Sequence, residues 1–325
     1  MSTPAQQKAL VLQEKGGQFA LINREVPTPT RGSLLIKNES IGLNPVNWKI
    51  QQLGLFIPEY PAVVGLEAAG TVHTVGEGVT DFEKGDRVLY KASFGNDEAP
   101  YQQWWNSSLM QRASKLPDGI SFDAAATVPT ALATSAVALY SQPGGPQYTS
   151  PWAEGGRGKY AGQPLVITGG ATVVGSAAIQ LGKLSGFSPI ITTASLKNAA
   201  LLQSYGATHV LNRNLSADAL RAETQAVAYG LLAPGGKLVV ILPPSVKETT
   251  EGRTITGLAT GVRLQQDPQF AEGLFKAIPA LLQSGEIKPL NVEVVPGGLA
   301  GIVSGLLKKN QVSAAKLIVH PQETA

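Results

Sequence analysis

The chain has 325 residues, a net charge of +3 and 15% charged residues. These values allow two globular domains and give no sign of a polyanionic partner. There is no cysteine, which excludes disulfides, thiol nucleophiles and thiolate metal ligands. The 36 glycines and 22 prolines follow no repeat period, so neither a collagen-like nor a disordered tract fits. Because basic residues and aromatics do not cluster together, we expect no nucleic-acid partner.

The start of the chain, residues 1–8, lacks the apolar core of a signal peptide. The longest apolar stretch, residues 165–184, is interrupted by glycines and polar residues. It therefore predicts a strand, a turn and a helix, and not a membrane span. We expect a soluble, cytoplasmic protein that does not bind a membrane.

The first 130 residues contain short β-like runs that are separated by turn residues, and this spacing predicts a β-barrel-like region. The runs are Gln7–Leu12, Ser33–Ile41, Gly70–Val75 and Asp86–Tyr90.

From Ala131 onward the pattern changes to alternating helices and strands. An apolar helix over 131–140 and an irregular loop over 142–163 come first. Strands are predicted at 165–168, 190–192, 208–211, 237–241 and 254–258, with helices at 174–184 and 196–205. Gly206 suits the end of the second of these helices. This alternation predicts an α/β fold with a doubly wound parallel sheet.

One strand of that sheet is missing from the sequence. Between the third strand and Lys237 only helix-like sequence occurs, over residues 217–232. A doubly wound sheet needs a strand there, beside its first strand. Either about 20 residues are absent near Glu223–Thr224, or the sheet is unusual. We favour the absence, because a sheet without a central strand should unfold.

A glycine-rich turn follows the first predicted strand. Gly170 and Gly175 match the first and third positions of the G-x-G-x-x-G dinucleotide motif, and Thr172 replaces the middle glycine. Val173 and Val174 then open a helix whose free N–H groups and dipole suit a pyrophosphate. The Thr172 hydroxyl is a candidate additional donor. On its own the motif also fits plain packing, but its strand–turn–helix setting favours a cofactor.

The end of the second strand indicates which cofactor binds. NAD sites place a carboxylate there, whereas this chain has no acid in residues 193–198. Ser195, Lys197, Asn198 and, after the third strand, Arg213 suit the 2′-phosphate of NADP. The alternative is that the two cations are solvated surface charges. We predict NADP.

Two longer motifs carry a family resemblance. Gly65-Leu66-Glu67-Ala68-Ala69-Gly70-Thr71-Val72, followed by Gly76, Val79 and Gly85-Asp86-Arg87-Val88, resembles the signature of medium-chain dehydrogenases/reductases. Gly42-Leu43-Asn44-Pro45-Val46-Asn47-Trp48-Lys49 is similar to the G-x-N-P-x-D-x-K segment of their zinc-free branch. That branch holds quinone oxidoreductases and enoyl reductases, and the fungal trans-acting enoyl reductases are the most similar. The resemblance covers nearly the whole chain.

The sequence differs from the zinc-dependent members at the positions of their metal ligands. There the position of Leu66 is a histidine ligand and a cysteine stands near Asn44, so we expect no metal site here. His73, His209 and His320 lack ligand spacing. Without a metal, an electron-poor conjugated alkene is an easier hydride acceptor than a carbonyl.

The resemblance implies a GroES-like domain over 1–130 and 266–325, with a Rossmann NADP-binding domain over 131–265 between its parts. It places Val46, Asn47, Trp48 and Lys49 beside the nicotinamide ribose and Thr134 near the nicotinamide. It also implies backbone contacts to the cofactor from Leu242-Pro243 and Val312-Ser313. Lys49 is the first candidate to polarise the substrate oxygen or relay a proton, with Thr134 beside it. The alternative is an ordinary surface lysine.

We therefore predict an NADPH-dependent reductase acting on the C=C bond of a small enone or enoyl substrate. A quinone reductase and a non-catalytic NADPH-binding protein are the alternatives. A monomer or a homodimer fits equally. The aromatic residues Phe56, Trp104, Trp105, Trp152 and Tyr160 either line the substrate pocket or belong to the core or a domain interface.

Overall fold

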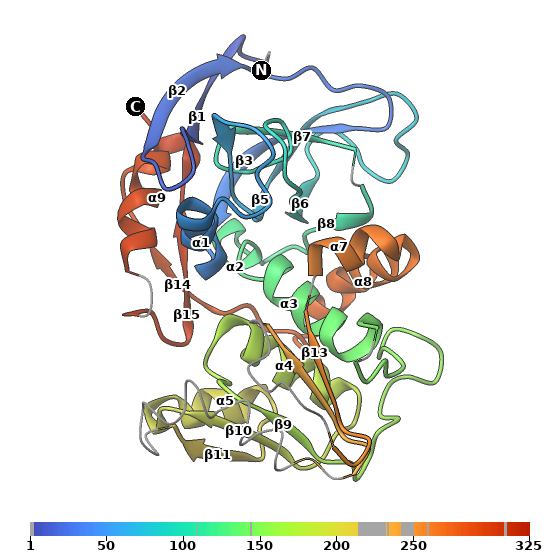
Figure 1. The fold of residues 1–325 in the computed structure, drawn as a ribbon. Helices are drawn as coiled ribbons and strands as arrows, with labels where there is room; N and C mark the ends of the chain where they lie inside the picture. The colour runs from blue at the N-terminus through green and yellow to red at the C-terminus, as the bar shows by residue number, and fades with distance from the viewer. Residues whose placement is uncertain are drawn as a thin grey trace. The chain divides into compact units, whose positions relative to one another are not determined.

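The structure is a computed structural model that describes residues 3–325 except 109, 144, 214–231, 233, 242–249, 259 and 309–310. The chain forms two compact units (Figure 1). The first contains residues 1–130, 278–283 and 289–325, and the second contains 131–277 and 284–288. The sequence placed residues 266–277 and 284–288 with the first unit, whereas in the structure they group with the second.

The first unit is built on two largely antiparallel sheets. In the smaller sheet β1 (Gln6–Leu12) lies between β2 (Phe19–Glu25) and β4 (Ala62–Val63). The larger sheet has the order β14-β15-β3-β5-β6-β8, and β7 also pairs with β3. Its strands are β14 (Asn291–Val294), β15 (Ala315–Val319), β3 (Leu34–Gly42), β5 (Glu67–Val75), β6 (Arg87–Lys91), β8 (Ala113–Lys115) and β7 (Trp104–Ser107).

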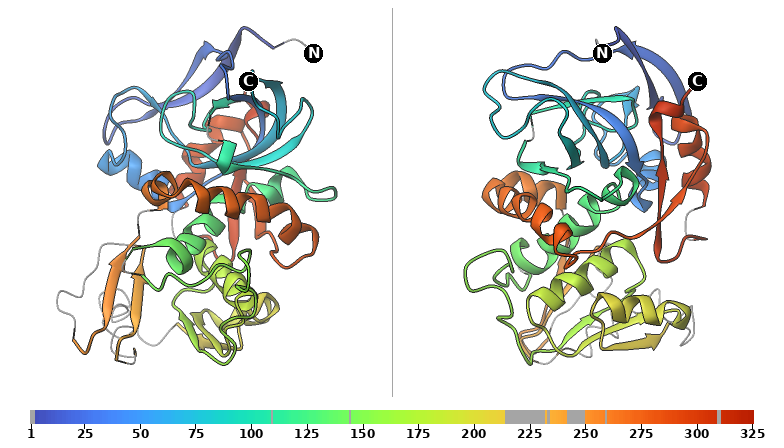
Figure 2. Two further views of the ribbon diagram at one scale, coloured as in Figure 1. Left: turned by 90° about the vertical axis from the view of Figure 1, so that its right-hand side faces the viewer. Right: turned by 180° about the vertical axis from the view of Figure 1, so that it is seen from behind.

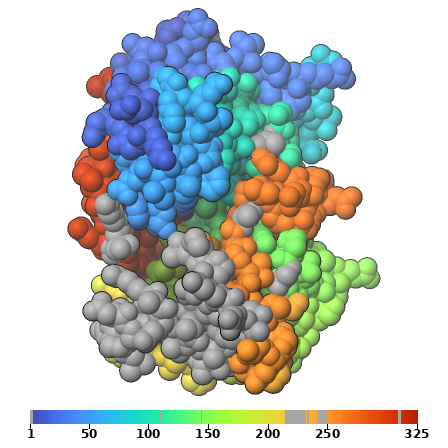
Figure 3. All heavy atoms as spheres, viewed as in Figure 1, coloured from blue at the N-terminus to red at the C-terminus, as the bar shows by residue number. Residues whose placement is uncertain are grey.

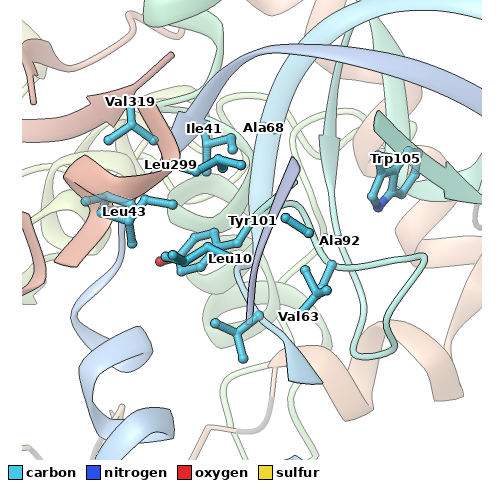
Figure 4. Packing of buried hydrophobic residues seen from close by; sticks show 14 of the residues in the cluster. Leu10, Ile41, Leu43, Val63, Ala68, Ala92, Tyr101, Trp105, Leu299 and Val319 are labelled. Atoms are coloured by element: carbon cyan, nitrogen blue, oxygen red, sulfur yellow. The ribbon is translucent and has the colours of Figure 1, made fainter. Parts of the chain in front are cut away.

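One hydrophobic core joins these sheets. Leu10 from β1, Ile41 from β3 and Val319 from β15 meet Leu299 in it, all nearly inaccessible to water (Figure 4). Aliphatic strand residues of this kind stabilise by removing apolar area from water. The helical elements of this unit are α1 (Pro45–Leu53), the 3₁₀ turns at Met110–Arg112 and Pro321–Glu323, α2 (Phe122–Ala125) and α9 (Gly298–Leu307).

The second unit confirms the predicted α/β alternation. β9 (Leu165–Ile167), β10 (Ile190–Ala194) and β11 (His209–Asn212) form a parallel sheet in the order β11-β10-β9. The helical elements are α3 (Pro129–Ala136, which begins in the first unit), a π-helix at Val137–Ser141, α4 (Val173–Leu184), a 3₁₀ turn at Leu196–Asn198, α5 (Ala199–Tyr205), α7 (Thr260–Gln266) and α8 (Pro268–Gln283, which ends in the first unit).

The remaining strands of the second unit form a separate parallel pair. β12 (Lys237–Val240) pairs with β13 (Thr254–Gly257), apart from the three-stranded sheet (Figure 2). Within the described residues no ladder joins β9 to β12, and Val166 of β9 is 52% exposed. The segment near Glu223–Thr224, where the sequence predicts a missing strand, lies outside the described residues.

One helical stretch is long and apolar enough to cross a membrane by length and composition. It is Phe122–Ser141, which runs through α2, α3 and the π-helix, and 72% of it is buried inside the protein. Core helices of globular proteins have the same character, so this stretch is explained by packing.

The C-terminus is held to the first unit by a small polar cluster. His320 Nε2 lies 2.9 Å from Asp123 Oδ1, and His320 Nδ1 lies 3.0 Å from Glu323 Oε1. Ser40 of β3 donates to the same Asp123 oxygen. Burial by itself would lower the pKa of His320, but its hydrogen bonds to the two carboxylates outweigh burial and raise the pKa.

A pKa that folding raises means that the protonated histidine stabilises the fold. This stabilisation is complete below the unfolded pKa of about 6.5 and is lost as the pH rises through the higher folded value. Replacing His320 by Gln should therefore lower the free energy of unfolding by about 0.5–1 kcal/mol more at pH 6 than at pH 9. Thermal unfolding of both proteins at the two pH values measures this difference. The matched change His209→Gln, at an exposed histidine, should show none.

Candidate active site

A buried carboxylate lies at the centre of the polar residues in the first unit. Glu67, the first residue of β5, accepts hydrogen bonds from Asn44 Nδ2 at 2.6 Å and from the backbone N–H of Thr130 at 2.8 Å. Lys316 of β15 forms an ion pair with it, and both side chains are fully buried. Lys316 Nζ also donates to Asn44 Oδ1 at 3.0 Å. Since a buried charge is costly unless it is paired and hydrogen-bonded, these partners belong together.

The backbone of β3 makes room for this carboxylate. Gly42 lies across from Glu67, and a Cβ at Gly42 would lie 2.5 Å from Ala126 O and 3.0 Å from Glu67 Oε1. Only glycine fits there. Two residues later, Asn44 has extended backbone angles, and its backbone N–H donates to Asn47 Oδ1 at 2.8 Å. Asn44 and Pro45 therefore fix where α1 begins.

Four predicted cofactor residues lie on α1. Asn47 is buried, and Val46, Trp48 and Lys49 are half-buried. The Lys49 ammonium lies 5.6 Å from the centroid of the Trp48 ring. It has no hydrogen bond or ion pair to any described residue, so its N–H donors are available to a ligand. The first part of the chain, drawn in blue, reaches the surface on the face shown in Figure 3.

Val312 and Ser313 are half-buried and precede β15. The Lys316–Asn44 contact joins the start of β15 to the residue before α1. Leu242 and Pro243, the third such segment, lie outside the described residues.

The glycine turn of the second unit has the geometry that a phosphate site needs. Gly169 adopts φ +75°, and its N–H donates to Thr193 Oγ1 at 3.0 Å. A Cβ on Gly170 would lie 2.2 Å from Thr192 Oγ1, and one on Gly175 would lie 2.3 Å from Gly169 O. Both predicted glycines are therefore required sterically.

The first turn of α4 presents free donors. Thr172 caps this helix by accepting the Gly175 N–H at 3.0 Å, which leaves the hydroxyl hydrogen of Thr172 free to donate elsewhere. The N–H groups of Val173 and Val174 have no acceptor within the described residues. A helix N-terminus with such donors binds phosphates readily.

Thr134 lies on α3, which packs against the same helix. Its neighbour Ser135 donates to Val174 O at 2.8 Å and to Ala131 O at 3.0 Å. Thr134 itself is 8% exposed. The structure therefore places Thr134 one residue from a direct contact with the phosphate turn.

The residues predicted to choose the cofactor lie together after β10. The Arg213 N–H donates to Ala194 O at 2.9 Å, which brings Arg213 to the end of that strand, beside Ser195. Lys197 and Arg213 are exposed and have no salt bridge to a described residue. Asn198 is 9% exposed. The four residues thus follow the carboxyl ends of β10 and β11.

The sequence left open whether five aromatic residues line a pocket or belong to a core. For three of them the structure shows packing against another aromatic ring. Trp105 stacks on Tyr90 with 3.8 Å between ring centroids, Tyr160 stacks on Phe187, and Trp152 packs edge-on against Tyr140. These side chains are packing residues of their own units. Trp104, 7% exposed, packs against His73, whereas Phe56 is 57% exposed and stacks on Phe94.

Two buried cations were not among the residues predicted from the sequence. They are Lys316, described above, and Lys91. Lys91 is the last residue of the apolar strand β6 and is 5% exposed. Burial lowers its pKa to about 8, although the charge of Glu67 opposes the shift. A lysine at an inward position of a strand was the available signal.

The position at which zinc-dependent members have a histidine ligand is apolar in this chain. Leu66 is 7% exposed, and in the described part of the chain no three His, Cys, Asp or Glu side chains lie close enough to hold a metal. Each histidine has its own partner: His73 the Thr3 hydroxyl, His209 the Thr208 hydroxyl, and His320 its two carboxylates.

Comparison with known proteins identifies the family. Residues 30–134 match the alcohol dehydrogenase GroES-like domain. The dehydrogenase azaJ of Aspergillus niger is 30% identical over 341 aligned positions, which cover 94% of this chain and 96% of the relative. The chain belongs to the medium-chain dehydrogenase/reductase superfamily. It is thus an oxidoreductase, which implies a nicotinamide cofactor and a small-molecule substrate.

Other relatives agree. The trans-enoyl reductase grgB of a Penicillium species is 29% identical over 358 positions, with 97% of this chain and 98% of the relative covered. The quinone oxidoreductase of Pseudomonas syringae has the same fold, with a TM-score of 0.76, 21% identity and 96% and 99% of the two chains covered. The predicted family and the GroES-like plus Rossmann-type fold are therefore confirmed.

The alignments also bear on the incomplete sheet. Those with azaJ and grgB are longer than the 325 residues of this chain, so both relatives contain internal residues that this chain lacks. A strand between β9 and β12 is the element that the described fold lacks. The sequence predicts that such a strand would lie near Glu223–Thr224.

We therefore expect a repaired chain to be more stable. Inserting the additional grgB residues between Glu223 and Thr224 should raise the Tm of the second unit by several degrees, because a central strand buries apolar area on both faces. Thermal unfolding with limited proteolysis as a second readout measures this. A Gly/Ser insertion of equal length is the control. Equal or lower Tm with the grgB segment would contradict the strand assignment.

Proposed function

We propose that this protein is an NADPH-dependent reductase that transfers hydride to the C=C bond of an enone or enoyl substrate without a metal. The observation that carries the proposal is Lys49, a half-buried cation on α1 without an anionic partner among the described residues. It supplies a donor for a carbonyl oxygen where zinc-dependent relatives use the metal. The named relatives, trans-enoyl reductases among them, support this substrate class.

The residues of the second unit fit a dinucleotide. The glycine turn leaves no space for side chains at Gly170 and Gly175, and the α4 N-terminus offers the N–H groups of Val173 and Val174. These groups would hold the pyrophosphate, with the Thr172 hydroxyl as a further donor. Ser195, Lys197, Asn198 and Arg213 would hold the 2′-phosphate. In NAD sites an acid stands near this position, and here none follows β10 before Arg213.

The chemistry needs one hydride and one proton. A bound NADPH would supply the hydride for the β-carbon of the substrate, and negative charge would then collect on the carbonyl oxygen. Lys49 would donate a hydrogen bond to that oxygen and so stabilise the enolate. A proton from water, added at the α-carbon, would complete the saturated product. Thr134 would position the nicotinamide, and Val46, Asn47, Trp48, Val312 and Ser313 its ribose side; Leu242 and Pro243 complete the proposed contacts.

A quinone reductase is the second candidate, favoured by the fold match to quinone oxidoreductases. A quinone oxygen would need the same donor. A protein that binds NADPH without turnover is the third. A substrate panel followed by NADPH absorbance separates the three: enone consumption, quinone consumption or neither. We further propose a soluble cytoplasmic monomer or homodimer that binds no nucleic acid or membrane.

Cofactor preference is the first test. NADPH should bind at least about tenfold more tightly than NADH, which corresponds to about 1.4 kcal/mol. The double change Lys197→Ala with Arg213→Ala should weaken NADPH selectively and leave NADH little changed, because only NADPH carries the 2′-phosphate. Titration calorimetry gives the dissociation constants. Lys276→Ala, at an exposed lysine of α8, is the control, and equal constants for both cofactors would refute the assignment.

The role of Lys49 is the second test. Lys49→Ala should lower kcat by roughly 10²-fold or more, while the affinity for NADPH changes less. Steady-state kinetics with an enone measure the effect, and Lys84→Ala, at an exposed lysine of the same unit, should behave as wild type. Product analysis should find the saturated ketone. An allylic alcohol would instead show that the carbonyl is reduced, and normal turnover of the variant would make Lys49 a bystander.

A further inference from the structure

Three charged side chains form a group at the larger sheet of the first unit. Glu67 of β5 pairs directly with Lys91 of β6 in the antiparallel ladder. β6 pairs with β8 up to Tyr90 and Ala113, and Arg112, the last residue of the 3₁₀ turn, directly precedes β8. Glu67 and Lys91 lie opposite each other in antiparallel strands, so they share a face of the sheet and their Cβ atoms lie about 5 Å apart. The positive charge of Arg112 also acts on Lys91.

The charges in this group do not balance. Both carboxylate oxygens of Glu67 are already used, by Lys316, Asn44 and the Thr130 N–H. Lys91 has no hydrogen bond or salt bridge to a described residue, although it is only 5% exposed. Arg112 is 2% exposed, and its Nε and Nη2 have no hydrogen-bond partner. Glu98 attracts Arg112 but forms no salt bridge with it.

Two neighbouring buried cations with unused donors destabilise the folded state. Their like charges repel each other. Buried charges without a counter-charge are expensive, and buried N–H groups without acceptors lose their hydrogen bonds to water. Such groups commonly indicate a water or an ion that satisfies them. One singly charged anion between Lys91 and Arg112 would satisfy all of them.

We infer that Lys91 and Arg112 form a binding site for a small carboxylate inside the GroES-like unit. A carboxylate suits the pair because a guanidinium presents parallel N–H donors to its two oxygens, and the ammonium adds a third donor. The site is separate from Lys49, and the inference does not depend on the proposed reductase activity. The carboxylate belongs either to an acid of one or two carbons or to an acid with a longer hydrocarbon chain.

The charge state of Lys91 supports this inference. Burial lowers its pKa to about 8, Arg112 and Lys316 lower it further, and Glu67 raises it. Burial also lowers the pKa of Arg112, against the charge of Glu98. Lys91 is thus cationic at pH 7 and neutral well above pH 8. An anion that binds the cation must bind less well at pH 9.5, because deprotonation removes half of the site.

The experiment is a thermal-unfolding titration of the full chain. Acetate replaces the bulky anion isethionate at constant ionic strength, at pH 7 and at pH 9.5. At pH 7 we expect acetate at about 0.2 M to raise the Tm by about 2 °C or more, through preferential binding to the folded state. The rise should be much smaller at pH 9.5. Formate and crotonate in parallel distinguish an acid of one or two carbons from an acid with a longer hydrocarbon chain.

Lys91→Met tests the site itself. Without acetate this variant should be more stable than wild type at pH 7, because it removes an uncompensated buried charge, and it should lose the response to acetate. Arg112→Gln should lose the response as well. Lys84→Met, at an exposed lysine, should respond as wild type does. A purely structural lysine would change the Tm without changing the acetate response. The inference is overturned if wild type does not respond or if Lys91→Met responds equally.

Discussion

The carboxylate of Glu67 is the constraint on which the arrangement of the first unit depends. It is fully buried, and its hydrogen-bonding partners come from three segments far apart in the sequence: Asn44 before α1, Thr130 at the start of α3, and Lys316 in β15. Losing one partner would leave charge unpaired in a low-dielectric interior, which typically costs several kcal/mol. The same carboxylate thereby fixes the starts of two helices. α1 carries Lys49 and α3 carries Thr134, the two residues with a proposed catalytic role.

The cofactor half of the site depends on a different constraint, close approach of backbone. Gly170 and Gly175 are required because β10 side chains and the turn itself occupy the space of a Cβ. Ser135 then ties α3 to the first turn of α4 through Val174 O. The groups here that could attract an anion are the N–H groups at the start of α4 and the exposed cations Lys197 and Arg213. Under the proposed function, rigid backbone geometry would hold the phosphates, which are alike in all dinucleotides, while exposed surface side chains would bind the one group that distinguishes NADP from NAD.

Local patterns in the sequence predicted local structure. The strand–turn–helix around Gly170 is encoded within a dozen residues, and the alternation of β9, α4, β10, α5 and β11 was predicted accordingly. β2 was missed because its exposed, partly polar sequence lacks a buried stripe. The Glu67–Lys316 pair joins residues 249 positions apart, so no window of sequence contains it. For the same reason Trp105 and Tyr160 could not be distinguished from pocket residues until their stacking partners, Tyr90 and Phe187, were placed.

The glycine turn follows β9, a strand that pairs along one edge only within the described residues. In the doubly wound order 3-2-1-4-5-6, the described strands β11-β10-β9 and β12-β13 are the two flanks, and the fourth position has no described strand. β9, expected at the centre, leaves Val166 half exposed. The turn after β9 is nevertheless held from the β10 side: Thr192 Oγ1 donates to Ile167 O at 2.6 Å, Thr193 Oγ1 accepts the Gly169 N–H, and Thr193 O accepts the Gly170 N–H at 3.0 Å. These contacts do not involve the other edge of β9. They therefore hold the glycine turn independently of whatever lies beyond that edge.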